Sequence, residues 1–282
     1  SVELMRGEKG KAVKLTISRE GMEPFEVTIV RDIIKIQSVK HEVYDDIGYL
    51  RITSFTEQTE KGLLKSIDTI EKENEDINGY ILDLRSNPGG LLNQAVKVTD
   101  IFLKRGEIVS TRGRETNDIK RYRAKNKDIT NGKPIVVIIN GGSASASEIV
   151  AGALQDHRRA IIIGTQSFGK GSVQTIIPFQ RSNSDNVSGI RLTTARYYTP
   201  SGESIQGKGI TPDIIIEQGE FESFDFKRYS ESDLKDSLDK EDENLNKEED
   251  EVELSAKEER LAKDYQLRRA LDLIRGLSLF EE

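Results

Sequence analysis

The 282-residue chain is 35% hydrophobic and 32% charged, carries a net charge of −7 and contains no cysteine. It is long enough to bury at least one full hydrophobic core, and the absence of cysteine excludes disulfides, thiolate metal sites and thiol catalysis. No apolar run approaches the roughly 18 residues of a membrane-spanning helix, and the first residues lack the pattern of a signal peptide. Composition therefore predicts a soluble, globular protein of one or two domains.

The negative charge is concentrated in one segment. Residues 217–260 carry eighteen Asp and Glu against seven Lys and Arg, so the rest of the chain has a small positive excess. The segment has almost no apolar periodicity, which predicts a disordered linker, and it lacks the glycine and alternating carboxylates of a calcium loop. Because basic residues do not cluster with aromatic ones anywhere in the chain, we expect no nucleic-acid partner.

The first elements in chain order are two alternating apolar and polar segments, KAVKLTISRE and EPFEVTIVRD, separated by Gly21. This alternation predicts an antiparallel hairpin. Two strands alone do not form a stable domain. We therefore expect the chain to begin inside a small β-rich module whose first half is missing.

From residue 47 onward, short apolar strands alternate with amphipathic helices. The predicted strands include IGYLRITSF, GYILDLR, PIVVIIN and RAIIIGT. Helices of about 12 to 16 residues between such strands predict βαβ crossovers and a mainly parallel sheet with both faces covered. Three of the strands are followed by glycine-containing turns, in LDLRSNPGG, IINGGSASASE and IIIGTQSFGKG. Any one tight turn can need glycine, but three at the carboxyl edge of one sheet predict a site.

The C-terminal residues predict one more helix. Leu261, Tyr265, Leu267, Leu271 and Ile274 fall near one helical stripe, and a glycine two residues beyond them provides a C-cap at position 276. We expect this helix to dock on the body of the protein or on a partner subunit.

The loop GTQSFGKGSVQ, residues 164–174, is a near match to a phosphate-binding loop. The Walker pattern needs a hydroxyl directly after the lysine to hold magnesium, and Gly171 stands there instead. The loop should also open a helix, whereas SVQTIIPF is rich in β-branched residues and predicts a strand. Both differences argue against nucleotide binding.

Ser145 stands before the predicted helix ASEIVAGALQDH, three residues ahead of Glu148, which is the spacing of a capping box. Ser145 can therefore cap the helix, or attack a carbonyl beside the amides and dipole of the helix amino end. A serine nucleophile needs a general base. His157 lies about 18 Å along the same helix, and His41 lies in a charged segment, so Lys170 is the remaining candidate.

Lys170 can act as a base only when its amine is neutral, and burial beside apolar groups favours the neutral amine. We expect the run AIIIG together with Phe168 to supply that burial. Gln174 can then orient the amine through its carboxamide oxygen without adding a charge. The simpler interpretation makes Lys170 an exposed turn residue and Gln174 an outward residue of a strand.

The blocks LDLRSNPGG, NGGSASASEI, IGTQSFGKGSVQ and YYTPSGESIQGKGITPD follow one another in the chain. Together they resemble the carboxyl-terminal processing proteases, also called tail-specific proteases, which are serine endopeptidases with a Ser-Lys dyad. The similarity runs from the opening hairpin to about residue 217, and RALDLIRGL is similar to some bacterial members. The resemblance implies an α/β fold with a mixed, mainly parallel sheet of the crotonase and Clp-protease type.

By position, the resemblance implies that Ser145 is the nucleophile, Lys170 the base and Gln174 the residue that positions the lysine. It implies no metal, nucleotide or other cofactor. It also implies an oxyanion hole made of backbone amides, one from Ala146 and the other from either Gly89 or Gly90.

The resemblance also divides the chain into parts. Residues 1–34 correspond to the C-terminal part of a PDZ domain, 35–217 to the protease core, 218–256 to the acidic linker and 257–282 to a helical segment. The implied substrates are proteins or peptides with apolar carboxyl tails, cut near their carboxyl termini. An adaptor protein, a homo-oligomer formed through the terminal segments and a location in the bacterial periplasm, or on the periplasmic side of a membrane, are further implications.

Two other classes of protein share this type of fold. A peptide-binding scaffold with an inactive or gated site would be expected to have replaced Ser145 or Lys170, and neither is replaced. A crotonase-like enzyme acting on thioesters should lack this serine and lysine and should carry a basic coenzyme pocket, which the sequence does not indicate.

Overall fold

The computed structural model describes residues 2–32, 37–74, 76–115, 117–125, 128–179, 188–219 and 256–279. The chain divides into two units, Ser1–Gln37 and Ser38–Glu282. The predicted acidic linker, residues 218–256, lies almost entirely outside the described residues.

The first unit contains the antiparallel hairpin that the alternating sequence predicts. Its elements are α1 (Val2–Met5), β1 (Ala12–Arg19) and β2 (Met22–Val30). The strands pair from Ala12 opposite Val30 to Ile17 opposite Phe25. Gly21 has a φ of +80° in the turn, a conformation that glycine adopts without steric cost.

The second unit is built on a six-stranded sheet with the order β12-β9-β8-β5-β4-β3. The strands are β3 (Val39–Tyr44), β4 (Ile47–Ile52), β5 (Gly79–Asp83), β8 (Ile135–Ile139), β9 (Ile161–Gly164) and β12 (Ile214–Ile215). The edge pair β3 and β4 is antiparallel, and the other neighbours are parallel. The prediction of a mixed, mainly parallel sheet is confirmed.

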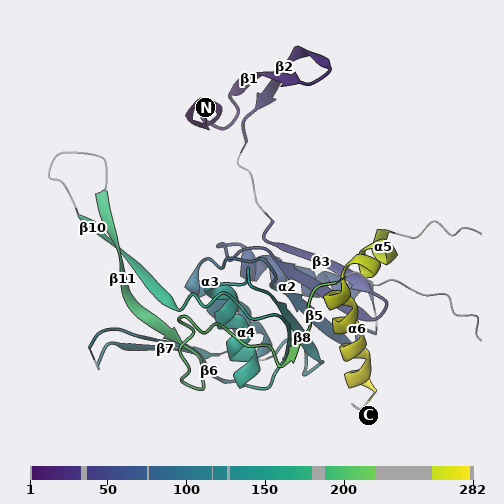
Figure 1. Cartoon of the computed structure of the whole chain (residues 1–282), viewed down its shortest axis with the longest axis vertical. Coiled ribbons are helices and arrows are strands. Elements are labelled where there is room, and N and C mark those ends of the chain that lie inside the picture. The colour runs from purple at the N-terminus through teal and green to yellow at the C-terminus, as the bar shows by residue number, and fades with distance from the viewer. Residues whose placement is uncertain are drawn as a thin grey trace, which may run out of the picture. The chain divides into compact units, whose positions relative to one another are not determined.

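Helices lie on both faces of this sheet (Figure 1). Side chains alternate between the faces along each strand, so that in β8 Ile135, Val137 and Ile139 join one core and Val136 and Ile138 join another. The first core includes helices α2 (Thr59–Glu73), α3 (Leu92–Phe102) and α4 (Ala146–Asp156), and the second includes α6 (Tyr265–Ser278). Burial on both faces explains why the strand is apolar throughout.

A second sheet is antiparallel and has the order β10-β11-β6-β7. Its strands are β6 (Gly106–Arg112), β7 (Ile119–Ala124), β10 (Ser172–Phe179) and β11 (Ser188–Tyr198). β10 is the strand predicted directly after the lysine loop, and with β11 it projects from the body (Figure 1). The sequence did not predict β7, because an exposed edge strand carries charged residues in place of an apolar pattern.

The predicted C-terminal helix is interrupted at Asp264, which separates α5 (Ala256–Lys263) from α6. Leu267, Leu271 and Ile274 are buried against the sheet, so docking on the body is confirmed. The predicted C-cap at Gly276 is wrong, because α6 continues to Ser278; contacts with the sheet support helical turns that local propensity alone does not. Within the described residues, no helix has the length and hydrophobicity needed to cross a membrane.

Candidate active site

The three glycine-containing turns meet at the carboxyl edge of the six-stranded sheet, as predicted. The N–H of Ala144, after β8, donates to the carbonyl of Asn87, after β5, at 3.0 Å. The N–H of Phe168, after β9, donates to the carbonyl of Ser143, also at 3.0 Å. The segment that carries Ser145 is therefore bonded on one side to the SNPGG turn and on the other to the lysine loop.

Ser145 is the residue before the first turn of α4, and its backbone is left-handed, with φ of +56° and ψ of −107°. Ordinary N-cap residues have extended backbone angles. A non-glycine residue in a sparsely populated region carries strain of about 1–3 kcal/mol, and such residues cluster at functional sites. Ser145 forms a capping box with Glu148, but capping by itself does not require a left-handed backbone.

Glu148 joins the backbone of Ser145 to that of Lys170. Its carboxylate is fully buried and accepts four hydrogen bonds. Oε2 accepts from the N–H of Ser145 at 2.7 Å and from the N–H of Lys170 at 2.9 Å. Oε1 accepts from the Ser167 hydroxyl at 2.6 Å and from the N–H of Gly169 at 2.5 Å. The capping-box spacing predicted the bond to Ser145, and the three bonds to the lysine loop were missed.

Asn87 is fully buried and performs a similar task in the SNPGG turn. Its Oδ1 accepts from the N–H of Gly89 at 2.9 Å, and its Nδ2 donates to the carbonyl of Ile52 at 2.8 Å. Its own carbonyl accepts from the N–H of Ala144 and from the Ser147 hydroxyl, both at 3.0 Å. Sequence analysis missed this residue, although asparagine in a Pro-Gly turn is a known signal for side-chain bonds to nearby backbone.

The two glycines of the turn differ in how their amides are used. Gly89 has a φ of +95°, and a Cβ added there would lie 2.9 Å from the nitrogen of Ala146, so this close approach requires glycine. The N–H of Gly89 already donates to Asn87. Among the described residues, the amides of Gly90 and Ala146 have no acceptor. The free amides are therefore that of Ala146, directly after the strained serine, and that of Gly90, directly after the glycine that packs against Ala146.

The expectation that the Lys170 side chain is buried is wrong. We expected it to be buried by AIIIG and Phe168, but Lys170 is exposed and Phe168 keeps 68% of its surface accessible. The isoleucines of β9 point into the two cores and so cannot cover the amine. Within the described part of the chain, Lys170 Nζ has no hydrogen bond or ion pair with Ser145, Gln174 or any other residue. Gln174 lies on β10 and is also exposed.

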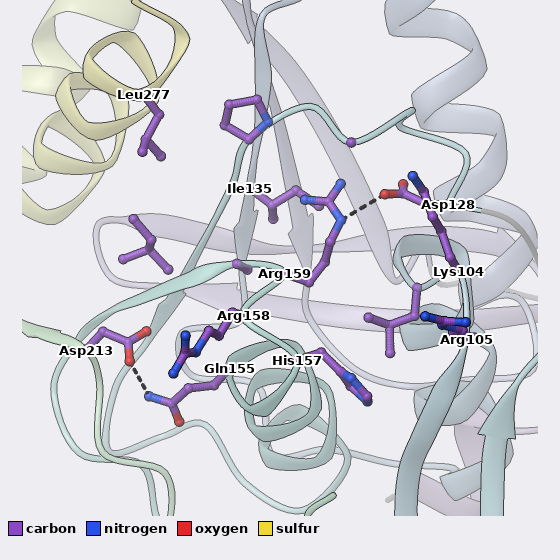
Figure 2. A pocket seen from close by; sticks show the side chains of 15 residues that line it. Lys104, Arg105, Asp128, Ile135, Gln155, His157, Arg158, Arg159, Asp213 and Leu277 are labelled. Carbon is purple, nitrogen blue, oxygen red and sulfur yellow. Dashed lines mark hydrogen bonds and ion pairs between the residues drawn. The ribbon is translucent and has the colours of Figure 1, made fainter. Parts of the chain in front are cut away.

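The two histidines are held at other places. His41 Nδ1 lies 3.1 Å from the Ser66 hydroxyl, and His157 Nε2 lies 2.7 Å from the carbonyl oxygen of Glu107. His157 lines a cavity of about 650 Å³ at the amino ends of β8 and β9 (Figure 2). Because the candidate nucleophile follows the carboxyl end of β8, His157 is at the opposite edge of the sheet. No group of His, Asp or Glu within the described ranges is arranged to hold a metal ion.

A buried ion cluster stands directly before the SNPGG turn. Arg85 donates from Nη2 to Asp83 at 2.6 Å and from both Nη atoms to Asp264, each at 2.7 Å. Burial alone would lower the pKa of Arg85, but its bonds to Asp264 and Asp83 outweigh that effect and raise the pKa. Burial would likewise raise the pKa of Asp264, but the bonds and charge of Arg85 hold that pKa below its ordinary value. Sequence analysis did not single out these residues.

Comparison with known proteins agrees with this geometry. The profile described as peptidase family S41 matches residues 46–216. The chain is 61% identical over 221 residues to the carboxy-terminal-processing protease of Bartonella bacilliformis, and this match covers 77% of this chain and 50% of that protein. It is 40% identical over 218 residues to the carboxy-terminal processing protease CtpA of Bacillus subtilis, and this second match covers 77% of this chain and 45% of that protein. The chain therefore spans about half the length of these relatives.

The solved structure of the photosystem II D1 C-terminal processing protease superimposes on this one with a TM-score of 0.57. The two are 30% identical, and the match covers 75% of this chain and 57% of that one. The family profile covers more than half of the chain and includes all three turns that meet at the candidate site. The chain thus belongs to peptidase family S41, a family of serine-type peptidases.

Proposed function

We propose that the protein is a serine endopeptidase that cuts polypeptides near their carboxyl termini, with Ser145 as nucleophile and Lys170 as general base. The observation that carries this proposal is the left-handed Ser145 at the amino end of α4, followed by the amide of Ala146, which has no acceptor among the described residues. A helix cap needs neither the strain nor the free donors. Acyl transfer needs an exposed nucleophile and an oxyanion hole.

The amides of Ala146 and Gly90 are the proposed oxyanion donors. The Gly89 amide is the weaker candidate of the two glycines, because it already donates to Asn87 at 2.9 Å. The amino end of α4 adds the positive potential of the helix dipole at the same place. Loss of one such donor typically lowers the rate by about 10² to 10³.

Lys170 is the proposed base, although its amine is exposed. Glu148 holds the backbone N–H groups of Ser145 and Lys170 at one carboxylate oxygen, so the chemistry requires only that the flexible lysine side chain turn towards the serine. A polypeptide lying over the site would exclude water there, and this favours the neutral amine. Gln174, four residues farther on and on β10, is the proposed acceptor that orients the amine.

The proposed reaction proceeds by acyl transfer. Neutral Lys170 takes the hydroxyl proton as Ser145 Oγ bonds to the peptide carbonyl carbon, and the amides hold the resulting oxyanion. The C–N bond then breaks, and the ammonium group of Lys170 returns its proton to the leaving amine. In the second half, water loses a proton to Lys170 and attacks the ester carbon; the C–Oγ bond then breaks, the ammonium group of Lys170 returns the proton to Ser145 Oγ, and the acid product leaves.

For the whole protein we infer a domain organisation and a setting. Residues 1–34 are the proposed C-terminal part of a PDZ domain that recognises apolar carboxyl tails, residues 35–217 the protease core, 218–256 a linker and 257–282 a helical segment. We propose that the protein works outside the cytoplasm, in a bacterial periplasm. We also propose that it acts with an adaptor protein and forms a homo-oligomer. Support comes from the names of the relatives and from the hairpin of the first unit. Because the apolar stripe of α6 is buried on the sheet, an oligomer would have to use other surfaces.

A peptide-binding scaffold of the same fold, with a gated or inactive site, is the second candidate. The observation that favours it is the exposed Lys170 amine, which has no partner among the described residues. No described residue holds this amine within hydrogen-bond reach of Ser145, which a general base requires.

The deciding experiment measures cleavage of an unstructured polypeptide with an apolar carboxyl tail by the parent chain, Ser145→Ala and Lys170→Ala, with product masses read by mass spectrometry. We expect the parent to cut near the carboxyl end and both variants to be inactive, with thermal unfolding unchanged in Lys170→Ala and both variants still folded. Cleavage that persists in Ser145→Ala would overturn the nucleophile assignment. Saturable binding of the tail without cleavage by any of the three proteins would identify the scaffold.

A further inference from the structure

Helix α6 is joined to the candidate active site by a buried ion pair. Asp264 precedes the first turn of α6, and its two carboxylate oxygens accept from the two Nη atoms of Arg85, each at 2.7 Å. Arg85 directly precedes the turn 86–90, which ends at the proposed oxyanion donor Gly90. The two residues are 179 positions apart in the chain.

The pair is built to hold one geometry. The side chains of Arg85 and Asp264 are 9% and 14% exposed, and Asp83 on the other side of the guanidinium is fully buried. A planar guanidinium that meets carboxylates on two sides is fixed in orientation as well as in position. Gln266 adds a further acceptor on α6 for Nη1, at 3.2 Å. Buried charges of this kind are costly to leave unpaired.

The start of the turn 86–90 is fixed by two further hydrogen bonds. The backbone N–H of Arg85 donates to Asp83 at 2.9 Å, and the next residue, Ser86, has a left-handed φ of +54° and donates its N–H to Asn140 at 2.8 Å. Asn87 then bonds the segment that carries Ser145. A displacement of Arg85 would therefore act on a short turn that is strained at Ser86 and runs through Asn87 to Gly90.

We propose that Asp264 is a positioning residue for catalysis: through Arg85 it sets the start of the turn 86–90 and thereby the direction of the Gly90 amide. This role rests on the proposed function, because it assumes that the Gly90 amide serves the oxyanion. It extends the working parts of the site to a helix that lies beyond the residues matched by the family profile.

The rival explanation is that Asp264 only stabilises α6. Asp264 also accepts a capping bond from the N–H of Leu267 at 3.0 Å, so a variant must keep the cap and remove the charge. Asp264→Asn does this, because asparagine caps helices as well as aspartate does. Leu271→Ala is the matched control, because Leu271 is buried on the same helix but in the apolar core.

The test uses the full 282-residue chain and a small activated ester, which needs no recruitment of a polypeptide tail. Steady-state kinetics and thermal unfolding are measured for the parent, Asp264→Asn, Asp264→Glu, Arg85→Lys, Leu271→Ala and Ser145→Ala. We expect Asp264→Asn to lower kcat about tenfold with little change in KM, as a small displacement of a catalytic donor does. Leu271→Ala should lose as much thermal stability or more and keep kcat within about twofold, because its cavity acts on unfolding.

Two further results are expected. Asp264→Glu, which keeps the charge, should restore most of kcat, and the effects of Asp264→Asn and Arg85→Lys should not add when combined, because both break one contact. A kcat loss in Asp264→Asn no greater than in Leu271→Ala would overturn the positioning role alone. Ester hydrolysis by Ser145→Ala at the parent rate would instead overturn the proposed function, and the positioning role with it.

Discussion

The two halves of the candidate site are held in different ways. Around Ser145 the backbone is strained, and it is bonded through Asn87 on one side and Glu148 on the other, both fully buried. Around Lys170 the backbone is held by the same Glu148, but the side chain is exposed. Gln174 is exposed as well, on the edge strand β10.

This difference teaches which part of the proposed chemistry is built in advance. The proposed oxyanion donors are backbone amides of segments that Asn87 and Glu148 hold by hydrogen bonds, so their geometry exists before a substrate arrives. The proposed base is a long, exposed side chain that has no partner among the described residues, so its position relative to Ser145 is not fixed in advance. We therefore expect substitutions near Ser145 to affect both folding and rate, and substitutions of Lys170 or Gln174 to affect rate alone.

The substitution Lys170→Arg should distinguish the two halves of the site most clearly. Arginine stays protonated and cannot serve as a base, so we expect cleavage to fall by about 10² to 10⁴, the range of general base catalysis. Because the Lys170 side chain is exposed and has no partner among the described residues, the free energy of unfolding should change by less than about 0.5 kcal/mol. Lys208→Arg, an exposed lysine paired with Glu203, is the control. Retained cleavage would remove Lys170 from the mechanism.

Glu148→Gln tests the network that the two halves share. The amide group would place a donor among N–H and O–H groups that also donate, so we expect about a hundredfold loss of kcat together with a lower melting temperature. Glu60→Gln, which changes only an exposed ion pair with Lys97, should do neither. If kcat falls while stability does not, the network serves geometry alone and the contrast between the halves weakens.

Gln174→Ala should have a smaller effect, confined to rate. Gln174 is exposed on β10, so folding does not depend on it, and loss of one orienting hydrogen bond is worth about 1 kcal/mol, or roughly fivefold in kcat. Gln174→Glu would add a negative charge that favours the protonated amine, and its activity should recover only at higher pH. Equal pH profiles for the parent and Gln174→Glu would contradict contact between the two side chains.

The smallest effect concerns acid stability at the buried ion pair. The pKa of Asp264 is held below its ordinary value in the folded protein, so its charge contributes stability that is fully present above about pH 4 and is lost as the pH falls through the folded-state pKa. Thermal unfolding of the parent should therefore lose more stability below pH 4 than that of Asp264→Asn. Parallel curves for the two proteins would show that the pair does not stabilise the fold.

Much of the fold could be predicted from local patterns. Alternation predicted the first hairpin, apolar runs predicted the strands of the parallel sheet, and a stripe of Leu267, Leu271 and Ile274 predicted a docked helix. The glycine turns were correctly placed at one edge because parallel strands end on the same side. Strands β3, β6 and β7 and the end of α6 were not predicted, because tertiary contacts there override the local signal.

The sequence by itself determined the class of sheet, the convergence of three turns and the absence of a Walker loop, since Gly171 and a following strand are local facts. Only the tertiary structure decided that Lys170 is exposed, that Gly89 uses its amide on Asn87, that Glu148 bonds two loops and that Asp264 reaches Arg85. The physical reason is the distance along the chain over which each kind of interaction acts. Periodicity and turn preferences act over a few residues, whereas burial and the pairing of polar groups depend on which distant segments pack together.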